Sequence, residues 1–381
     1  MIAQLITRLS MGGAQEIVLR ISKDLNKHQI QNIIITGKSN KKSLSAPNNT
    51  LLEEAIEGRL NLDIVNHLSD RINLFKDFLA LVNIYRSFKR YKPKIVHIHS
   101  SKTGLLGRVL KFFFRNTHFI YHVHGWSFSR YKGIRKKVFF YIEYFLYYFT
   151  DSYIFVCNFD LDQFIELGGP KSIKQKSKVI YPGVDFLSLK EITQSRENIR
   201  KLYKIKNDEY LIGNVARLDH QKDPFLFINM AAKLKEISSH KKLKFMWIGS
   251  GNLMSECISL VEEMGLEDNF IFTGYIEDVS AYFSIFDHFV ISSAYEGLPV
   301  TAIKALGSGV PLNSVGINGI NDLNIYKGVN LTYNRNPVDL AKSVNTSILE
   351  DLSHDDFDNI RIIFSNHSML NSLRKNYEQK F

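Results

Sequence analysis

The sequence predicts an α/β protein of two domains, each with a parallel sheet covered by helices on both faces. Its 381 residues are more than one hydrophobic core usually organises, so two domains of ordinary size are expected. Short apolar runs alternate with segments of helical periodicity, which favours parallel sheets. Polar loops containing glycine follow several of these runs, and open α/β sheets bind ligands at that end of their strands.

The composition is that of a globular protein, with 45% apolar and 23% charged residues. No apolar segment reaches about 18 residues without a charge, and residues 1–6 lack the pattern of a signal peptide, so we expect a cytoplasmic protein. The two cysteines, Cys157 and Cys257, are far apart and favour free thiols. The net charge of +11 indicates an acidic partner, either nucleic acid, an anionic membrane or a phosphorylated small molecule.

The first α/β unit opens with a strand over 2–7, a loop over 8–13 and a helix over 14–25. Gly12 and Gly13 in that loop fit a ligand-binding loop and an ordinary tight turn equally well. Strands over 30–36 and 94–99 follow, with a helix over 73–91 between them that ends before Pro93.

A lysine and several small polar residues follow the strand over 94–99. Residues 100–104 read Ser-Ser-Lys-Thr-Gly and lead into a predicted helix over 105–114. Lys102 and the hydroxyls suit a phosphate or a hydroxyl-rich ligand. A capped helix start explains the serines equally well.

Four histidines lie on two predicted strands, at 97 and 99 and at 122 and 124, so each pair points to one face of the sheet. No carboxylate or cysteine accompanies them at metal-ligand spacing, and we predict no metal site. His124 ends the strand over 119–123, where Gly125 allows a sharp turn, and is the candidate for a ligand contact. A packed histidine at a strand end is the alternative.

The segment 128–149 mixes basic and aromatic residues. Arg135, Lys136 and Lys137 beside an aromatic-rich helix suit docking onto an anionic bilayer surface. The aromatic residues are otherwise core, with the lysines solvated. Interleaved bases and rings also suit single-stranded nucleic acid, but no recognisable motif accompanies them, so we expect no nucleic-acid partner.

A polar stretch over 188–206 separates the two halves of the chain. It lies between a turn over 179–185 and a new strand over 210–215, which predicts a first domain over 1–187 and a second over 188–365. In the loop after that strand, Arg217 and Lys222 lie five residues apart and could neutralise a diphosphate, although surface charges on a loop are common.

The stretch 296–311 joins a strand to a helix in a way suited to an anion. An apolar strand over 289–292 precedes Glu296, and Pro299 lies where a helix can begin. The carboxylate can bind sugar hydroxyls, and the amides around Gly297 and Leu298 can bind phosphate oxygens. The strand over 243–248 similarly ends in Gly249-Ser250-Gly251, where backbone could approach a ligand.

Taken together, these motifs resemble glycosyltransferase family 4. The second half carries the resemblance through Arg217 with Lys222, Gly249-Ser250-Gly251, Phe272-Thr273-Gly274-Tyr275 and Glu296-Gly297-Leu298-Pro299. The first half agrees through residues 8–13, 97–108, 122–126 and 181–185. The resemblance implies the GT-B fold, in which two Rossmann-like domains face each other across a cleft, with a final helix over 366–381 crossing back to the first domain.

The resemblance also implies a retaining, metal-independent transferase that uses a nucleotide-sugar donor and no cofactor. By position, Arg217 and Lys222 hold the donor diphosphate, Glu296 contacts the donor sugar, and His124 lies beside that sugar. Further donor contacts are implied for Gly12, Gly13, Gly249, Gly251, Gly297, Leu298, Pro299 and Lys304, and acceptor-side or phosphate contacts for Lys102 and Trp126.

Three positions depart from the family pattern. Lys304 replaces a glutamate that accepts hydrogen bonds from ribose in the family, and a charged lysine accepts none. Residues 315–322 lack the usual adjacent glycines followed by glutamate, and Pro182 stands where asparagine is common. Lys304 predicts an altered nucleotide contact, a substitute acceptor or weak activity, unless it is simply an exposed helical lysine.

We therefore expect a glycosyltransferase at the inner face of the plasma membrane that extends a lipid-linked oligosaccharide or a surface polysaccharide, such as capsule, O-antigen, exopolysaccharide or lipopolysaccharide. The expected partners are a nucleotide-sugar, a lipid-linked glycan and an anionic membrane surface. The alternatives are a nucleotide-sugar epimerase on the same fold and a weakly active or silent sugar-nucleotide-binding subunit.

Overall fold

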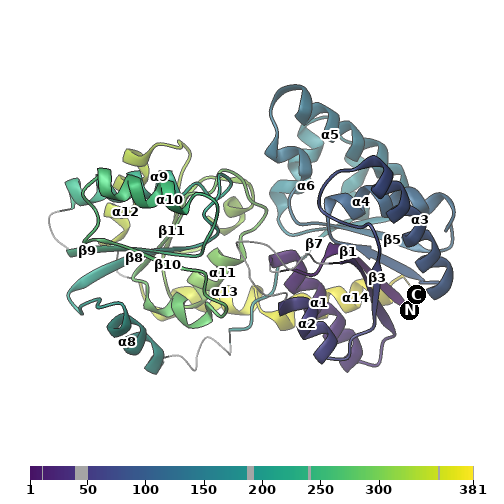
Figure 1. Ribbon diagram of the computed structural model, residues 1–381, viewed down its shortest axis with the longest axis horizontal. Helices are drawn as coiled ribbons and strands as arrows, with labels where there is room; N and C mark the ends of the chain where they lie inside the picture. The colour runs from purple at the N-terminus through teal and green to yellow at the C-terminus, as the bar shows by residue number, and fades with distance from the viewer. Residues whose placement is uncertain (11, 39–49, 187–192, 239–241, 351, 381) are drawn as a thin grey trace. The chain divides into compact units, whose positions relative to one another are not determined.

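The computed structural model describes residues 1–10, 12–38, 50–186, 193–238, 242–350 and 352–380 (Figure 1). The described chain forms two compact units, Met1–Gly183 with His367–Phe381 and Val184–Asn366. The expected boundary between 187 and 188 lies outside the described residues.

The first unit is a seven-stranded sheet in the order β3-β2-β1-β4-β5-β6-β7, with every pair parallel. This is the doubly wound order, whose switch point lies between β1 and β4. Its strands are β1 Ile2–Arg8, β2 Asn32–Gly37, β3 Leu62–Val65, β4 Ile95–Ile98, β5 His118–Val123, β6 Ser152–Phe155 and β7 Ser177–Val179. Its helices are α1 Gly13–Lys27, α2 Thr50–Glu57, α3 Leu74–Tyr91, α4 Ser101–Val109, α5 Gly133–Leu146, α6 Asn158–Glu166 and α14 Asn366–Glu378.

Apolar side chains on both faces of this sheet explain its helical cover. On one face, residues such as Val96 and Phe119 pack with Ala80, Ile84 and Phe88 of α3. The other face packs against α1 and α14, which Figure 1 shows side by side. The C-terminal helix supplies Met369, Leu373 and Tyr377 to that layer, so the last residues of the chain complete the core of the first unit.

The second unit repeats the plan with six parallel strands in the order β10-β9-β8-β11-β12-β13. Its strands are β8 Glu209–Val215, β9 Lys242–Ile248, β10 Phe270–Gly274, β11 His288–Ile291, β12 Leu312–Val315 and β13 Val329–Thr332. Its helices are α8 Thr193–Leu202, α9 Pro224–Ile237, α10 Met254–Glu263, α11 Val300–Gly307, α12 Pro337–Ser347 and α13 Asp358–Ile363. The switch point lies between β8 and β11, so the loops after those two strands are where this sheet is expected to bind a ligand.

The two-domain parallel α/β prediction is therefore confirmed. One helix start was wrong: the helix predicted over 105–114 begins at Ser101. Gly104 does not break it, because this glycine faces Tyr121, and a Cβ there would lie 2.8 Å from the ring. In the described residues, no helix is long and apolar enough to cross a membrane.

Candidate active site

The loops at the switch point of the second sheet bring Lys222 and Glu296 together, and Arg217 lies on the same loop as Lys222. The ammonium of Lys222 forms an ion pair with Glu296 Oε1, and Ser293 Oγ donates to the same oxygen at 2.9 Å. Both interactions use Oε1, which leaves Oε2 of Glu296 available to accept from a ligand hydroxyl. Lys222 and Glu296 are mostly buried, with side chains 20% and 11% exposed.

Asp219 organises the loop that carries the two cations. One of its oxygens accepts from the Lys222 amide at 3.0 Å, and the other pairs with the Arg217 guanidinium at 3.0 Å. Arg217 is the more exposed of the two cations, at 56%. The carboxylate of Asp219 therefore fixes the backbone at one cation while it orients the other.

Arg335 fixes the loop that carries Glu296. Its guanidinium donates to the carbonyls of Ser293 at 2.6 Å and Ser292 at 3.2 Å, and it pairs with Asp223. Asp223 in turn caps α9 by accepting from the Leu226 amide at 3.1 Å. Sequence reasoning missed Arg335, since it lies about forty residues beyond Glu296 and belongs to no motif.

Gly249 and Gly251 allow two neighbouring loops to pack closely against each other. A Cβ on Gly249 would lie 2.1 Å from the Ala216 carbonyl oxygen, and one on Gly251 would lie 2.1 Å from that of Leu218. Gly249 also has a φ of +136°, which side chains with L chirality rarely adopt. These glycines let the loop that carries Arg217 lie directly on the neighbouring loop, and their contact with a donor stays a prediction.

Pro299 caps α11, which begins one residue later, at Val300. The amides of Gly297 and Leu298 donate to no acceptor within the described residues. The backbone at Gly319 packs closely against these two residues, since a Cβ there would lie 2.7 Å from the Leu298 nitrogen and 2.3 Å from the Gly297 oxygen. Two free amides beside a carboxylate and two cations can bind a polar anion that also carries hydroxyls.

Lys304 lies one turn into α11 and is partly buried. Its ammonium is 5.9 Å from the centre of the Phe283 ring. The pKa of the nearby Asp278 carboxyl is lowered, mainly by the hydrogen bond from the Ser280 amide and in part by the charge of Lys304. No carboxylate within the described residues forms an ion pair with Lys304, so its charge is not neutralised locally.

The first unit holds a cavity of about 760 Å³ at the switch point of its own sheet. Thr7, His99, Ser100 and His124 line it from strand ends, and α3, α4 and α5 line it with mostly apolar side chains. Lys102 also lines it, but its ammonium pairs with Asp77 at 2.5 Å and donates to the Arg71 carbonyl. A ligand phosphate would have to compete with that carboxylate for Lys102.

Three predicted site residues of the first unit do not line this cavity. Trp126 is buried in an aromatic cluster and stacks on Phe128 and Phe164, with its indole donating to the Asp160 carbonyl. An acceptor cannot reach it, so its acceptor-side assignment is corrected. Gly12 caps α1 and Gly13 begins that helix, and neither lines the cavity.

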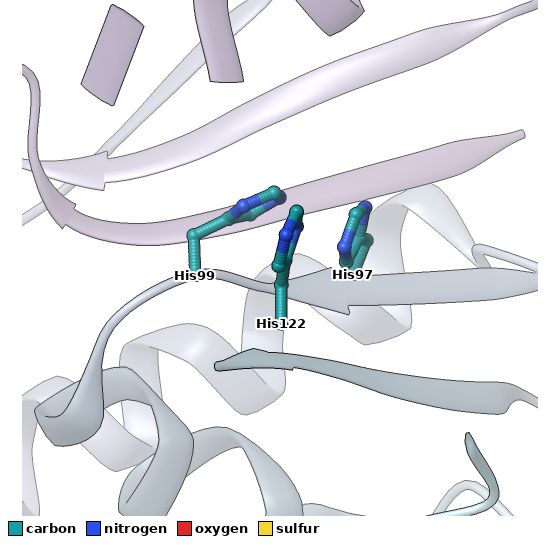
Figure 2. Close-up of side chains that lie close together, drawn as sticks. All are labelled: His97, His99 and His122. Atoms are coloured by element: carbon teal, nitrogen blue, oxygen red, sulfur yellow. The ribbon is translucent and has the colours of Figure 1, made fainter. Parts of the chain in front are cut away.

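Four histidines form a row that is buried at His97, His99 and His122 and ends with the partly buried His124 at the cavity. Figure 2 shows His97 on β4, His99 directly after the end of that strand, and His122 on β5, with their rings on the same side of the sheet. The rings of His97 and His122 stack 5.2 Å apart with planes 4° from parallel, and His124 stacks on His122. Burial lowers the pKa of His97, His99 and His122 well below 6.5 and that of His124 to about 3, so all four rings are neutral.

Nitrogen atoms of His97, His99 and His122 lie within 4.8 Å of one another, and neither nitrogen of His122 has a hydrogen-bond partner in the described part of the chain. Tetrahedral zinc needs imidazole nitrogens about 2 Å from the metal, with their lone pairs converging on it. The parallel rings of His97 and His122 face each other instead, which fits packed neutral imidazoles better than a metal site.

Hydrogen bonds determine which ring nitrogen of His124 donates and which accepts. Gln4 Oε1 lies 2.6 Å from His99 Nε2 and accepts its proton, which leaves His99 Nδ1 to accept from His124 Nε2 at 3.3 Å. His124 Nδ1 is then an acceptor. Gly125 beside it has a φ of +112°, which confirms the expected sharp turn after this strand.

The comparisons with known proteins agree with this geometry. Residues 11–186 match the model named Glycosyltransferase Family 4, and residues 195–360 match the model named Glycosyl transferases group 1. The chain belongs to glycosyltransferase family 4. Both family models fall on the units described above, one on each, and the chain is a glycosyltransferase with the GT-B fold.

Among its relatives, this family 4 chain is 28% identical over 274 residues to an Escherichia coli UDP-Gal:alpha-D-GlcNAc-diphosphoundecaprenol alpha-1,3-galactosyltransferase, over 71% of this chain and 70% of that one. It is 30% identical to the Salmonella typhi Vi polysaccharide biosynthesis protein VipC/TviE, over 37% of this chain but only 25% of that one. The crystal structure of Anabaena Alr3699/HepE in complex with UDP is 16% identical, covers 99% of both chains and has a TM-score of 0.81, which is a likeness of fold.

Proposed function

We propose that the protein is a retaining glycosyltransferase that moves a sugar from a uridine diphosphate sugar to a lipid-linked glycan, without a metal ion. The observation that carries the proposal is the group formed by Lys222, Glu296 and Arg217 at the switch point of the second sheet. Related proteins are named for a UDP-sugar donor and a diphosphate lipid acceptor, which supports both substrate classes.

The chemistry needs stabilisation of a departing diphosphate. Lys222 and Arg217 supply two positive charges, and the free amides of Gly297 and Leu298 supply two dipoles, so the negative charge that develops is met by groups already in place. Arrival of the diphosphate draws Lys222 from Glu296, whose carboxylate then accepts from the donor sugar. The acceptor hydroxyl attacks on the face that the diphosphate leaves, and its proton passes to the leaving phosphate.

The test is transfer to a synthetic α-GlcNAc diphosphate lipid from a panel of UDP-, GDP- and other nucleotide-sugars. We expect transfer from a UDP-sugar, an α-linked product by NMR, and unchanged turnover in EDTA. A β-linked product contradicts retention, and loss of turnover in EDTA contradicts metal independence. If no nucleotide-sugar binds by calorimetry at millimolar concentration, the transferase proposal fails.

The same proposal places the enzyme on the inner face of the plasma membrane, by way of α5. Its residues Ile134, Val138, Tyr141 and Phe145 recur every three or four positions and are all at least half exposed. The exposed cations Lys132, Arg135 and Lys137 flank this apolar stripe. Apolar side chains beside cations are what an anionic bilayer surface binds.

Sedimentation with anionic vesicles at low salt tests the membrane part. We expect binding that the triple substitution R135E, K136E and K137E abolishes. The matched control replaces the exposed Lys201, Lys206 and Lys342 of the second unit by glutamate and keeps binding. Equal loss in both triple variants would mean that net charge, not α5, attracts the protein.

A silent binding subunit remains the second candidate because Lys304 replaces an acceptor of ribose hydroxyls. In that case UDP-sugars bind, but neither transfer nor hydrolysis is measurable, and Lys304→Glu restores turnover.

A further inference from the structure

A chain of hydrogen bonds runs through the buried layer of the first unit, from the last helix to His124. Tyr377 Oη of α14 lies 3.3 Å from Gln4 Nε2 on β1, and Gln4 Oε1 lies 2.6 Å from His99 Nε2. His99 Nδ1 in turn lies 3.3 Å from Nε2 of His124, which lines the cavity. At the other end of the chain, Tyr377 Oη lies 2.6 Å from His97 Nδ1. The C-terminal helix is therefore connected, bond by bond, to a side chain at the cavity.

Burial makes the members of this chain depend on one another. Gln4, His97, His99 and Tyr377 are at most 2% exposed. A buried polar group that loses its partner cannot replace it with bulk water, and the loss is costly. The neighbours in the chain, and not solvent, therefore decide which atom of each residue donates.

Gln4 sets the direction of the chain, because its amide nitrogen can only donate and its amide oxygen can only accept. Tyr377 Oη accepts from Gln4 Nε2, which keeps the Gln4 oxygen toward His99. His99 therefore donates through Nε2 and accepts through Nδ1 from His124 Nε2. Within the described residues, no group bonds to Nδ1 of His124, which is left as an acceptor. If the Gln4 amide turned round, each of these bonds would reverse and His124 Nδ1 would become a donor.

We propose that Gln4 and Tyr377 are positioning residues of the transferase, which hold the proton of His124 on Nε2 so that Nδ1 accepts from a hydroxyl of the substrate. This inference rests on the proposed function and assigns it two buried residues far from any loop. Neither Gln4 nor Tyr377 lines the cavity, so both act only through the histidines between them and the ligand. An imidazole free to take either tautomer binds such a hydroxyl only in the tautomer that fits, and its apparent affinity falls by the fraction in that form.

The first test is the tautomer of His124, measured by nitrogen NMR on the full chain with its histidine rings labelled with nitrogen-15. The signals of His124 are identified by their loss in His124→Asn. We expect the wild-type ring to carry its proton on Nε2 alone. Gln4→Leu removes the acceptor of His99, and Tyr377→Phe removes the acceptor that holds the Gln4 amide, so both tautomers of His124 should be populated in each variant.

Tyr147→Phe is the matched control, because it also removes a tyrosine hydroxyl from the first unit. That hydroxyl bonds to Ser172 Oγ at 2.7 Å and has no contact with the histidine row. The control should leave the tautomer of His124 unchanged. The inference is overturned if the wild-type ring carries its proton on Nδ1, if Gln4→Leu and Tyr377→Phe leave the tautomer as it is, or if Tyr147→Phe changes it equally.

The second test asks whether Tyr377 acts through His124. We expect Tyr377→Phe to lower kcat/KM for sugar transfer at least about twofold, since about half of the rings then hold the unsuitable tautomer. In a His124→Asn background the same substitution should have no further effect, because the two residues are coupled. An equal loss in both backgrounds would mean that Tyr377 only stabilises the fold, and would overturn its positioning role.

The NMR measurement uses no substrate, so its outcome is independent of the transfer assay. A tautomer that responds to Gln4→Leu and Tyr377→Phe in a protein without transfer would retain the hydrogen-bonded chain and reject the proposed function. Transfer by a protein whose His124 tautomer is insensitive to both substitutions would do the reverse.

Discussion

Acidification should unfold the first unit, because the histidines of its row are neutral in the folded protein and bind protons only when the chain unfolds. His97, His99 and His122 are at most 2% exposed, and burial, with mutual repulsion of their charged forms, lowers their pKa well below 6.5. The unfolded chain binds protons at these residues below about pH 6.5, and the folded unit does not. Their contribution to stability is therefore complete above pH 6.5 and is lost as the pH falls.

The magnitude follows from the number of protons. Each histidine that is protonated only in the unfolded chain changes the free energy of unfolding by about 1.4 kcal/mol per pH unit, so the four of the row, His124 included, change it by about 5–6 kcal/mol. Domains are stable by roughly 5–15 kcal/mol in total. A fall of two pH units below 6 should therefore remove most of the stability of this unit.

The assay is urea unfolding at pH 7, 6 and 5, followed by tryptophan fluorescence in a Trp247→Phe background. The remaining tryptophan, Trp126, lies in the core of the first unit and reports on it alone. Neither nitrogen of His122 has a hydrogen-bond partner among the described residues, so His122→Phe should remove one of the four titrating groups and reduce the slope by about a quarter. His220→Asn, at an exposed position of the other unit, is the control. Stability that does not change between pH 7 and 5, or an unchanged slope in His122→Phe, would refute the reasoning.

Three further predictions concern single side chains. Lys222→Ala should lower turnover at least about tenfold, the usual loss for a group that stabilises developing charge, and unchanged steady-state turnover would mean that the diphosphate is held elsewhere. Arg335→Ala should weaken nucleotide-sugar binding, measured by calorimetry, because it releases the loop that carries Glu296. Arg335→Lys keeps the charge but not the forked contacts, so it should recover only part of the lost affinity. Glu143→Gln should lower the free energy of unfolding of the first unit by about 3–5 kcal/mol in urea, because it leaves the fully buried Arg108 without its carboxylate. The double variant Arg108→Met with Glu143→Leu should lose less stability than Glu143→Gln. An equal loss of stability in the two variants would contradict this account.

The sequence predicted the fold well because alternating apolar strands and helices determine a parallel α/β plan locally. It also singled out Arg217, Lys222 and Glu296, which lie in short loops directly after β8 and β11, and the strand order brings Lys222 and Glu296 into contact. It did not predict that Lys222 and Glu296 pair with each other. That contact depends on β8 and β11 being neighbours in the sheet although about seventy residues separate the two side chains.

Residues that act through tertiary contacts were missed or misread. Arg335 reaches the Glu296 loop from the segment before α12, and no local pattern indicates this. Trp126 looked like a ligand contact beside His124 and Gly125, yet its side chain points into the aromatic core. At positions 249 and 251 the sequence does not show that backbone from residues 216–218 occupies the space beside them, which is why glycine is needed there.

The position of α14 has a consequence for synthesis of the chain. Tyr377 Oη lies 2.6 Å from His97 Nδ1, and Met369 and Leu373 fill the same buried layer, so the first unit lacks part of its core until the final residues are made. A nascent chain must therefore carry an open apolar face through translation of the entire second unit. Truncation of the chain before residue 366, by a stop codon or by proteolysis, would leave that face permanently exposed. We expect such fragments to aggregate or bind chaperones and not to form stable single domains.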